Sequence, residues 1–302
     1  MSEDPSTQGV YRSGFVGIIG RPNVGKSTLL NNLVHRKLAI ISEKPQTTRN
    51  KIRCILTRDD AQIIFVDTPG LHKPRNALGE RLNKTVRETL SEVDVVVFML
   101  DGTQTIGKGD LFIAGELSGL QTPVVAVLNK IDKLVPEQVE AQLAVAENLG
   151  KFVDVIPLSA KTGENVHALI EKIVELLPEG PKYYPDDMIT DQPVTFIAAE
   201  LIREKVLQLT REEVPHSVAV VVEEMGKRED ADIVDIQAVI YVERDSQKGI
   251  IIGKGGRMLK EIGSRARREI EPLLGEKVFL QLQVKVEKDW SKRPQLVRRM
   301  GY

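Results

Sequence analysis

The segment GRPNVGKS at positions 20–27 constrains the fold of this 302-residue chain more than any other. It matches the pattern G-x-x-x-x-G-K-[ST], follows the apolar run FVGIIG (15–20) and opens the helix-like stretch KSTLLNNLV (26–34). Between a strand and a helix, such glycines let backbone N–H groups point inward at phosphate oxygens, and the helix N-terminus adds positive potential. The segment predicts a phosphate-binding loop in an α/β domain, with a fortuitous glycine turn as the alternative.

Short runs rich in Val and Ile alternate with helical patterns as far as about residue 177. After the first run come AQIIFVD (61–67), DVVVFML (94–100), PVVAVLN (123–129) and VDVIPL (153–158), with helical stretches near 78–92, 110–120, 137–149 and 165–177. Uninterrupted apolar runs are typical of strands that are buried on both faces of a sheet. We therefore predict a doubly wound, mainly parallel sheet.

Three further motifs lie where predicted strands end, at the edge where open α/β sheets bind ligands. They are DTPG (67–70), NKID (129–132) and SAK (159–161). The carboxylate of Asp132 can accept hydrogen bonds from N1–H and N2–H₂ of guanine, a donor pair that adenine lacks. Asn129 can bind N7 and tie loops together, and the Ala160 N–H can meet guanine O6. These residues predict a pocket selective for guanine.

The phosphate end of the pocket is predicted from the first two motifs. Lys26 can reach the β- and γ-phosphates, while the Ser27 hydroxyl and Asp67 can hold Mg²⁺. The Gly70 N–H can face the γ-phosphate. In order and content, the motifs resemble the GTPase family of P-loop proteins over about residues 14–178, which implies GTP and GDP with Mg²⁺. The predicted nucleotide-binding residues are Gly20, Arg21, Pro22, Asn23, Val24, Gly25, Lys26, Ser27, Thr28, Thr47, Thr48, Asp67, Thr68, Pro69, Gly70, Leu71, Asn129, Lys130, Ile131, Asp132, Ser159, Ala160 and Lys161.

The same resemblance implies which residues sense and hydrolyse the nucleotide. Thr48, in the segment EKPQTTRNK (43–51), matches the γ-phosphate-sensing Mg²⁺ ligand, with Thr47 as the runner-up. Leu71 stands where many small GTPases place a water-orienting glutamine, and with Asn23 it matches a subgroup in which K⁺ assists hydrolysis. K⁺ beside Asn23 is thus a hypothesis. The predicted catalytic residues are Lys26, Asn23, Thr48 and Gly70.

A second glycine-rich stretch, GIIIGKGG (249–256), follows a different pattern. Its lysine is followed by glycine, so no hydroxyl is placed for Mg²⁺. What remains is a G-x-x-G turn between a short apolar helix and a long basic one. The order helix–strand–strand–helix–helix–strand over 196–286 resembles the type II KH fold, whose G-x-x-G loop contacts an RNA backbone. A helix junction in an unrelated α+β domain is the alternative. The predicted RNA-binding residues are Ile250, Ile251, Ile252, Gly253, Lys254, Gly255, Gly256, Arg257 and Lys260, with the isoleucines supporting bases.

The segment PEGPKYYPDDMITDQP (178–193) contains four prolines and predicts a semi-extended connector. We therefore predict an N-terminal tail at 1–13, a GTPase domain at 14–178, a linker at 179–194 and a KH domain with a basic tail at 195–302. Residues 244–302 carry 15 basic and 7 acidic residues, whereas the net charge of the whole chain is −1. This asymmetry favours a polyanionic partner for the C-terminal domain.

Composition narrows the class of protein. A hydrophobic content of 41%, a charged content of 28% and a single cysteine, Cys54, are typical of a globular protein of a reducing cytoplasm. The longest apolar runs are too short for a membrane span, and the polar N-terminus is no secretory signal. Without a heptad pattern we expect a monomer. For the basic tail at 288–302, three alternatives stay open: an RNA contact, a lipid contact or packing.

The two predicted domains in succession are similar to the Era family of bacterial GTPases. The matching segments are QTTR (46–49), DTPGLH (67–72), PHSVAV (215–220) and GKGG (253–256). The resemblance implies binding near the 3′ end of 16S rRNA, a role in rRNA maturation and assembly of the small (30S) ribosomal subunit, and peripheral association with the inner face of the cell membrane. Two alternatives stay open: a membrane-associated signalling or cell-cycle GTPase, and an RNA-binding protein whose nucleotide site is only regulatory.

Overall fold

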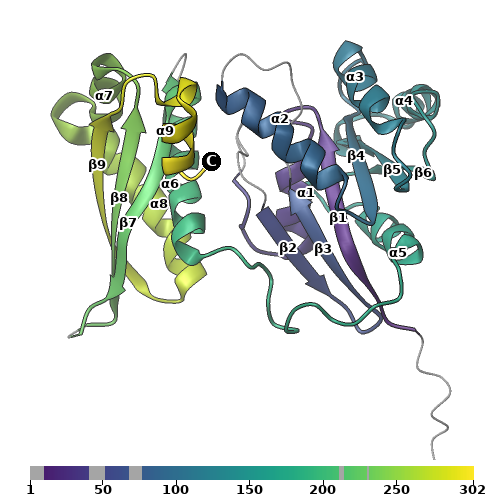
Figure 1. Cartoon of the computed structure of the whole chain (residues 1–302), viewed down its shortest axis with the longest axis horizontal. Helices are drawn as coiled ribbons and strands as arrows, with labels where there is room; N and C mark the ends of the chain where they lie inside the picture. The colour runs from purple at the N-terminus through teal and green to yellow at the C-terminus, as the bar shows by residue number, and fades with distance from the viewer. Residues whose placement is uncertain (1–9, 41–51, 68–76, 211–213, 230) are drawn as a thin grey trace, which may run out of the picture. The chain divides into compact units, whose positions relative to one another are not determined.

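The computed structural model of the chain describes residues 10–40, 52–67, 77–210, 214–229 and 231–302 (Figure 1). Its main division falls between Asp191 and Gln192, within the predicted linker. The two units on either side are described separately. Within the described residues, we find no helix with the length and apolar character to cross a membrane.

The first unit is built on a six-stranded sheet with the order β2-β3-β1-β4-β5-β6. Five neighbouring strands run parallel, and every residue of β3, β4 and β5 is buried, as expected for a sheet covered on both faces. The strands are β1 (Arg12–Gly20), β2 (Ile52–Thr57), β3 (Ala61–Asp67), β4 (Val95–Asp101), β5 (Val124–Asn129) and β6 (Asp154–Leu158).

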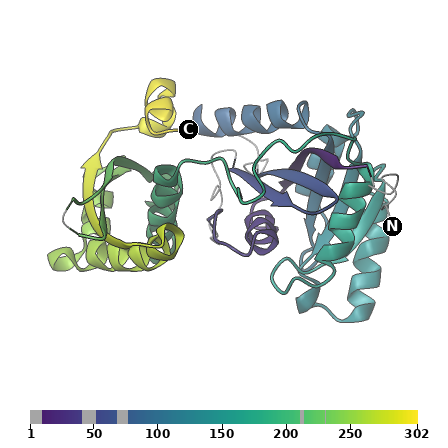
Figure 2. The ribbon, with the colours of Figure 1, turned by 90° about the horizontal axis from the view of Figure 1, so that it is seen from below.

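Helices cover both faces of this sheet. The apolar residues of α2, α3 and α4 join one buried cluster with strand residues such as Phe98 and Val96. In Figure 2, α1 and α2 lie on opposite sides of the strands β1 and β3. The helices are α1 (Lys26–Leu33), α2 (Ala77–Leu90), α3 (Lys108–Leu117), α4 (Pro136–Glu147) and α5 (Val166–Leu176). The predicted doubly wound, mainly parallel architecture is confirmed.

Strand β2 is missed by the sequence pattern. It pairs antiparallel with β3 at the edge of the sheet, in the register Ile55 to Ile64. Its sequence IRCILT is neither a clean alternation nor an uninterrupted apolar run, because Ile52, Cys54 and Ile55 are buried while Arg53 and Thr57 are partly exposed. Periodicity alone could not separate it from a loop.

The proline-rich segment after α5 lies along the edge of the first unit. The buried Gln62 side chain accepts hydrogen bonds from the backbone N–H groups of Tyr183 and Tyr184, at 2.7 and 3.0 Å. Farther along, the Ile55 N–H donates to the Ile189 carbonyl at 2.9 Å. The part of the predicted linker up to residue 191 is thus attached to the sheet edge rather than extended as a connector.

The second unit contains a three-stranded sheet with the order β7-β8-β9. β7 and β8 pair antiparallel, whereas β8 and β9 pair parallel. Its elements are α6 (Val194–Leu209), β7 (Ala219–Lys227), β8 (Ile233–Val242), α7 (Asp245–Ile252), α8 (Arg257–Leu274) and β9 (Lys277–Val286). This succession matches the predicted type II KH order. Helix α8 buries Ile262, Ala266 and Ile270 along one stripe and turns its basic residues outward.

The C-terminal tail packs on this sheet. After β9, a single turn at Trp290–Lys292 leads into α9 (Pro294–Arg299). The Trp290 side chain is fully buried and its Nε1–H donates to the Ser217 carbonyl at 2.8 Å. The surrounding cluster contains Ala219, Val239, Tyr241, Val297, Met300 and Tyr302. Of the three alternatives for the tail, packing is therefore the role that the structure shows, and the tryptophan is not exposed to lipid.

Candidate functional site

The loop between β1 and α1 requires glycine at both fixed positions. A Cβ at Gly20 would lie 2.6 Å from the Met99 carbonyl oxygen, where β1 and β4 come together. Gly25 has a φ of +109°, and a Cβ there would collide with the amide nitrogen of Asn129. Asn23 also adopts a positive φ, of 66°. The backbone therefore curls into a ring just ahead of α1, as the motif predicts.

Lys26 closes this ring. Its Nζ donates to the carbonyls of Gly20 at 3.1 Å and Arg21 at 3.0 Å, and the side chain is buried. Burial lowers the pKa of Lys26 to about 8, against the opposing effect of the Asp67 carboxylate. An anion bound inside the ring would favour the charged form of this ammonium group. The arrangement suits a phosphate chain.

The residues predicted to hold Mg²⁺ include two that lie side by side. The Ser27 hydroxyl donates to Oδ2 of Asp67 at 3.1 Å, and Asp67 is fully buried at the end of β3. A hydroxyl and a carboxylate are hard oxygen donors of the kind that Mg²⁺ takes next to phosphate oxygens. The remaining predicted residues of this part of the pocket, Thr47, Thr48, Thr68, Pro69, Gly70 and Leu71, lie outside the described residues.

The guanine end is assembled by hydrogen bonds between three loops. Asn129 donates from Nδ2 to the Val24 carbonyl at 2.7 Å and accepts from the Ala160 N–H at 2.9 Å. The Ser159 hydroxyl donates to Oδ1 of Asp132 at 2.7 Å, while the Asp132 side chain itself is exposed. This hydrogen bond orients the Asp132 carboxylate and leaves it accessible to a ligand. Asn129 thus ties the loops together as the sequence predicts.

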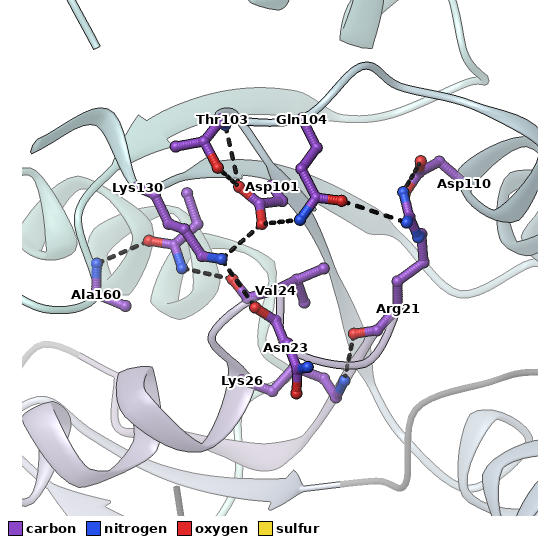
Figure 3. A network of polar contacts seen from close by, with 11 residues as sticks. Arg21, Asn23, Val24, Lys26, Asp101, Thr103, Gln104, Asp110, Lys130 and Ala160 are labelled. Carbon is purple, nitrogen blue, oxygen red and sulfur yellow. Dashed lines mark hydrogen bonds and ion pairs between the residues drawn. The ribbon is translucent and has the colours of Figure 1, made fainter. Parts of the chain in front are cut away.

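Lys130 links the guanine end to the phosphate loop. Its Nζ donates to the Asn23 carbonyl at 2.9 Å and pairs with Asp101 at 2.5 Å (Figure 3). On the far side of the loop, Arg21 pairs with Asp110 at 3.0 Å. Asp101 is the last residue of β4 and Asp110 lies in the first turn of α3, and sequence reasoning missed both. They belong to none of the motifs, so only the folded geometry reveals them.

The second glycine-rich turn joins α7 to α8. Gly253, Gly255 and Gly256 have φ values of 68°, 60° and 76°, in the left-handed region that favours glycine. A Cβ at Gly253 would also lie 2.7 Å from the Met258 Cβ. The side chain of Lys254 is exposed, as are those of the predicted RNA contacts Arg257 and Lys260. The turn presents open backbone flanked by cations.

A groove of about 470 Å³ begins at this turn and runs between α8 and β9. We call it the glycine-loop groove; it is lined by Gly256, Leu259, Lys260, Gly263, Ser264, Arg267, Phe279, Leu280 and Leu282. Phe279 is 46% exposed, and the Arg228 guanidinium lies 5.0 Å from its ring centroid. Of these residues the sequence predicted only Gly256 and Lys260, because nothing in the pattern shows that β9 forms the edge of the sheet.

One predicted RNA contact is wrong. Ile251 is fully buried in the core of the second unit, so its side chain cannot support a base. The helical period of α7 turns neighbouring residues to different faces, and Ile250 is 50% exposed while Ile252 is half-buried. Neither of them lines the groove. An apolar run in a helix cannot present all its side chains to one ligand.

Family models match both units. Residues 15–130 match a model described as "50S ribosome-binding GTPase", and residues 213–291 match a KH domain. The first match spans the phosphate loop and the start of the guanine-binding motif at Asn129. The second spans the glycine turn and the groove. The groove therefore lies within the KH match, whereas the GTPase match contains the phosphate end of the pocket and stops before Asp132, Ser159 and Ala160.

Two solved structures match almost the whole chain. A variant of Era from Aquifex aeolicus bound to GDP.AlF4⁻ is 42% identical, with a TM-score of 0.91, 96% of this chain covered and 99% of the other. Era in complex with MgGDPNP and nucleotides 1506–1542 of 16S ribosomal RNA is 43% identical, with a TM-score of 0.93 and coverages of 97% and 99%. With a guanine-nucleotide pocket in one unit, a glycine-loop groove in the other and this similarity over both, the chain belongs to the Era family of GTPases.

Proposed function

We propose that the chain is a GTP-hydrolysing switch that binds 16S rRNA near its 3′ end and acts in rRNA maturation and assembly of the small ribosomal subunit. The observation that carries this proposal is the presence in one chain of an organised guanine-nucleotide pocket and an open groove beside a G-x-x-G turn. The Era complex that contains both MgGDPNP and nucleotides 1506–1542 supports it.

In the nucleotide pocket, each end has its own task. Lys26 and the backbone N–H groups of the phosphate loop bind the β- and γ-phosphates, and Asp132 selects guanine. Ser27 and Asp67 would hold Mg²⁺, with Thr48 as the third protein ligand; the ion offsets negative charge on the phosphates. Lys26, Asn23, Thr48 and Gly70 are the residues that we assign to hydrolysis.

The K⁺ hypothesis concerns hydrolysis alone. Asn23 adopts a left-handed backbone conformation inside the phosphate loop, and its carbonyl is held by Lys130 at 2.9 Å. The position matches that of the family subgroup that uses K⁺, where the cation offsets charge that develops on the phosphates. Phosphate release measured in matched NaCl and KCl buffers tests the idea, and equal rates would eliminate it. An Asn23→Ala variant should lose any K⁺ stimulation.

We assign the glycine turn to the RNA backbone and the floor of the adjoining glycine-loop groove to the bases. Gly253 and Gly256 let a phosphate backbone approach, and Lys254 and Arg257 supply positive charge to it. Bases then rest on the apolar floor, where the exposed Phe279 ring provides a stacking surface. Lys260 extends the cationic rim along α8. This division predicts phosphate contacts that are sensitive to salt and stacking contacts that tolerate different bases.

Two measurements test the proposed function. Phosphate release with and without an RNA that corresponds to nucleotides 1506–1542 separates an enzyme from a protein whose nucleotide site is only regulatory. Crosslinking of the full chain to cellular RNA, in the presence of GDPNP or GDP, identifies the RNA that it binds. Recovery of the 3′ end of 16S rRNA, with turnover above the spontaneous rate, is the expected result. Absent turnover or crosslinks spread over unrelated RNAs would contradict the proposal.

Peripheral contact with the cell membrane is an outcome to be measured rather than a second function. The two aromatic side chains of the basic tail, Trp290 and Tyr302, are both buried. Flotation with anionic liposomes tests the contact directly. A signalling GTPase would float with lipid and show no preference for the ribosomal RNA.

A further inference from the structure

The end of β4 and the first turn of α3 each carry an acidic side chain that is almost completely buried. The Asp101 side chain is 4% exposed and the Asp110 side chain 3%. The exposed Gln104 lies between them in sequence. We propose that Asp101, Gln104 and Asp110 form a brace that positions the phosphate loop relative to the guanine end of the pocket. This inference rests on the proposed nucleotide site and adds positioning residues to it.

The first contact of the brace holds the beginning of the phosphate loop. Oδ2 of Asp110 accepts from Nη1 of Arg21 at 3.0 Å and from the Gly107 N–H at 3.0 Å, so one oxygen serves both α3 and the loop. The carbonyl of Arg21 in turn accepts from Lys26 at 3.0 Å. Asp110 is therefore connected through a single residue, Arg21, to Lys26, the side chain that is predicted to bind phosphate.

The second contact holds the middle of the loop through Lys130. Oδ1 of Asp101 accepts from the Thr103 N–H at 3.0 Å and the Thr103 hydroxyl at 2.6 Å. Its Oδ2 accepts from Lys130 at 2.5 Å, and Lys130 also donates to the Asn23 carbonyl at 2.9 Å. Although burial alone would raise the pKa of Asp101, the hydrogen bonds from Lys130 and Thr103 outweigh burial and lower the pKa. The carboxylate stays charged and keeps Lys130 against the loop.

Gln104 connects the two contacts (Figure 3). Its Nε2 donates to Oδ2 of Asp101 at 3.1 Å, and its Oε1 accepts from Nη2 of Arg21 at 3.4 Å. A continuous chain of polar contacts thus runs from Lys130 through Asp101, Gln104 and Arg21 to Asp110. These contacts hold the phosphate loop at residues 21 and 23. The loop therefore loses less conformational entropy when a nucleotide binds.

This arrangement predicts a specific kinetic signature. The brace acts on the nucleotide only through the phosphate loop, so its loss should weaken the binding of GTP and GDP alike and raise KM. Because that loop also carries Lys26 and Asn23, which we assign to hydrolysis, kcat should fall as well, but by a smaller factor than the rise in KM. GDP should dissociate faster. A residue that merely caps α3 would lower the melting temperature without changing nucleotide affinity.

The test uses the full chain, Mg²⁺ and a fluorescent GDP analogue, with Kd and dissociation rate as readouts. Asp110→Asn should weaken GDP binding by about tenfold, since the amide removes the negative charge that pairs with Arg21 in this buried contact. Arg21→Gln should have a similar effect. The double variant should be no weaker than either single variant, because both changes break one contact. Gln104→Ala, at an exposed position that should not impair folding, should weaken binding by about threefold.

Asp94→Asn is the matched control. Asp94 lies just before the opposite end of β4, where its Oδ2 accepts the Phe15 N–H at 2.7 Å, with no link to the phosphate loop. The Asp94→Asn variant should have a lower melting temperature than the unaltered chain, and its GDP affinity should differ from that of the unaltered chain by less than about twofold. If Asp110→Asn and Gln104→Ala also leave GDP affinity unchanged, or if the effects at Arg21 and Asp110 add, the brace is overturned. If the unaltered chain itself does not bind GDP, the proposed function fails instead.

Discussion

The nucleotide pocket and the glycine-loop groove are organised in opposite ways. In the pocket, the described binding side chains already have partners: Lys26 on two carbonyls, Asn129 on two loops and Asp132 on Ser159. In the groove, Lys260 is exposed and the floor is apolar, and the exposed Lys254 lies in the adjoining turn. The pocket is preorganised for one rigid ligand, whereas the groove can follow a flexible polymer.

This difference has an energetic consequence. A preorganised polar site gives high selectivity, because a wrong ligand leaves buried groups without partners. An open groove with exposed cations takes most of its affinity from phosphate contacts, which are sensitive to salt, and from stacking, which tolerates different bases. Single substitutions should therefore have large effects in the pocket and moderate effects in the groove.

The largest effect is expected at Asp132. In Asp132→Asn the carboxylate that accepts the guanine N1–H and N2–H₂ is replaced by an amide, so GDP affinity should fall by about a thousandfold. The amide can instead donate to the C2 carbonyl of xanthine, and xanthosine diphosphate should become the preferred ligand. Competition binding with both nucleotides measures the shift. Unchanged preference for guanine would show that the pocket is less selective than its geometry indicates.

A smaller effect is expected at the glycine turn. Lys254→Asp places a negative charge beside the RNA backbone and should weaken RNA binding on the order of tenfold at physiological salt. Lys288→Asp is a matched control, because this exposed lysine lies beyond the end of β9 and lines no part of the groove. Equal loss in both variants would mean that net charge, and not the turn, attracts the RNA. GDP affinity should be the same in both.

A still smaller effect is expected on the floor of the groove. Phe279→Ala removes the 46% exposed ring and should weaken RNA binding by about fivefold, the loss of one stacked base. The salt dependence of binding should not change, because no phosphate contact is lost. Fluorescence anisotropy at several salt concentrations measures both quantities. A steeper or shallower salt dependence would show that the ring acts through its neighbour Arg228 instead.

The smallest effect is expected at Ile250. Its side chain is 50% exposed beside the glycine turn but lies outside the groove, so Ile250→Ala should change RNA affinity by less than about twofold. Its neighbour Ile251 is fully buried, and Ile251→Ala should destabilise the protein by about 2–5 kcal/mol. Thermal unfolding and RNA binding of the two variants separate the roles. A large loss of RNA affinity in Ile250→Ala would extend the groove onto α7.

The sequence predicts the nucleotide pocket well because its residues are local. Gly20 to Ser27 form one continuous segment of chain. Asp67 and Asn129 end strands whose apolar runs are clear in the sequence, and Ala160 lies just after another. Parallel strands bring their carboxyl ends to one edge, so motif order alone places these residues together. The sequence does not show the brace, because Asp101 and Asp110 belong to no motif and their contacts with Lys130 and Arg21 are long-range.

The groove is harder to predict because it depends on strand order. The alternation of VFLQLQVKV predicts a half-buried strand, and β9 is one, but periodicity does not say that it lies at the edge beside α8. The alternation places Phe279 on the exposed side of β9 with Gln281 and Gln283, but only the folded structure shows that it lines the groove. The same limit explains the tail and the linker: the burial of Trp290 and the docking of residues 183–184 on Gln62 are long-range contacts.

A GTP-hydrolysing switch requires that the nucleotide bound in the pocket governs RNA binding in the groove. The direct measurement is the affinity of the full chain for an RNA that corresponds to nucleotides 1506–1542, at saturating GDPNP and at saturating GDP with Mg²⁺. RNA should bind more tightly with GDPNP than with GDP, and bound RNA should increase the affinity for GDPNP relative to GDP by the same factor, because coupling between two sites is reciprocal. Identical RNA affinities in the two nucleotide states would contradict the proposed switch.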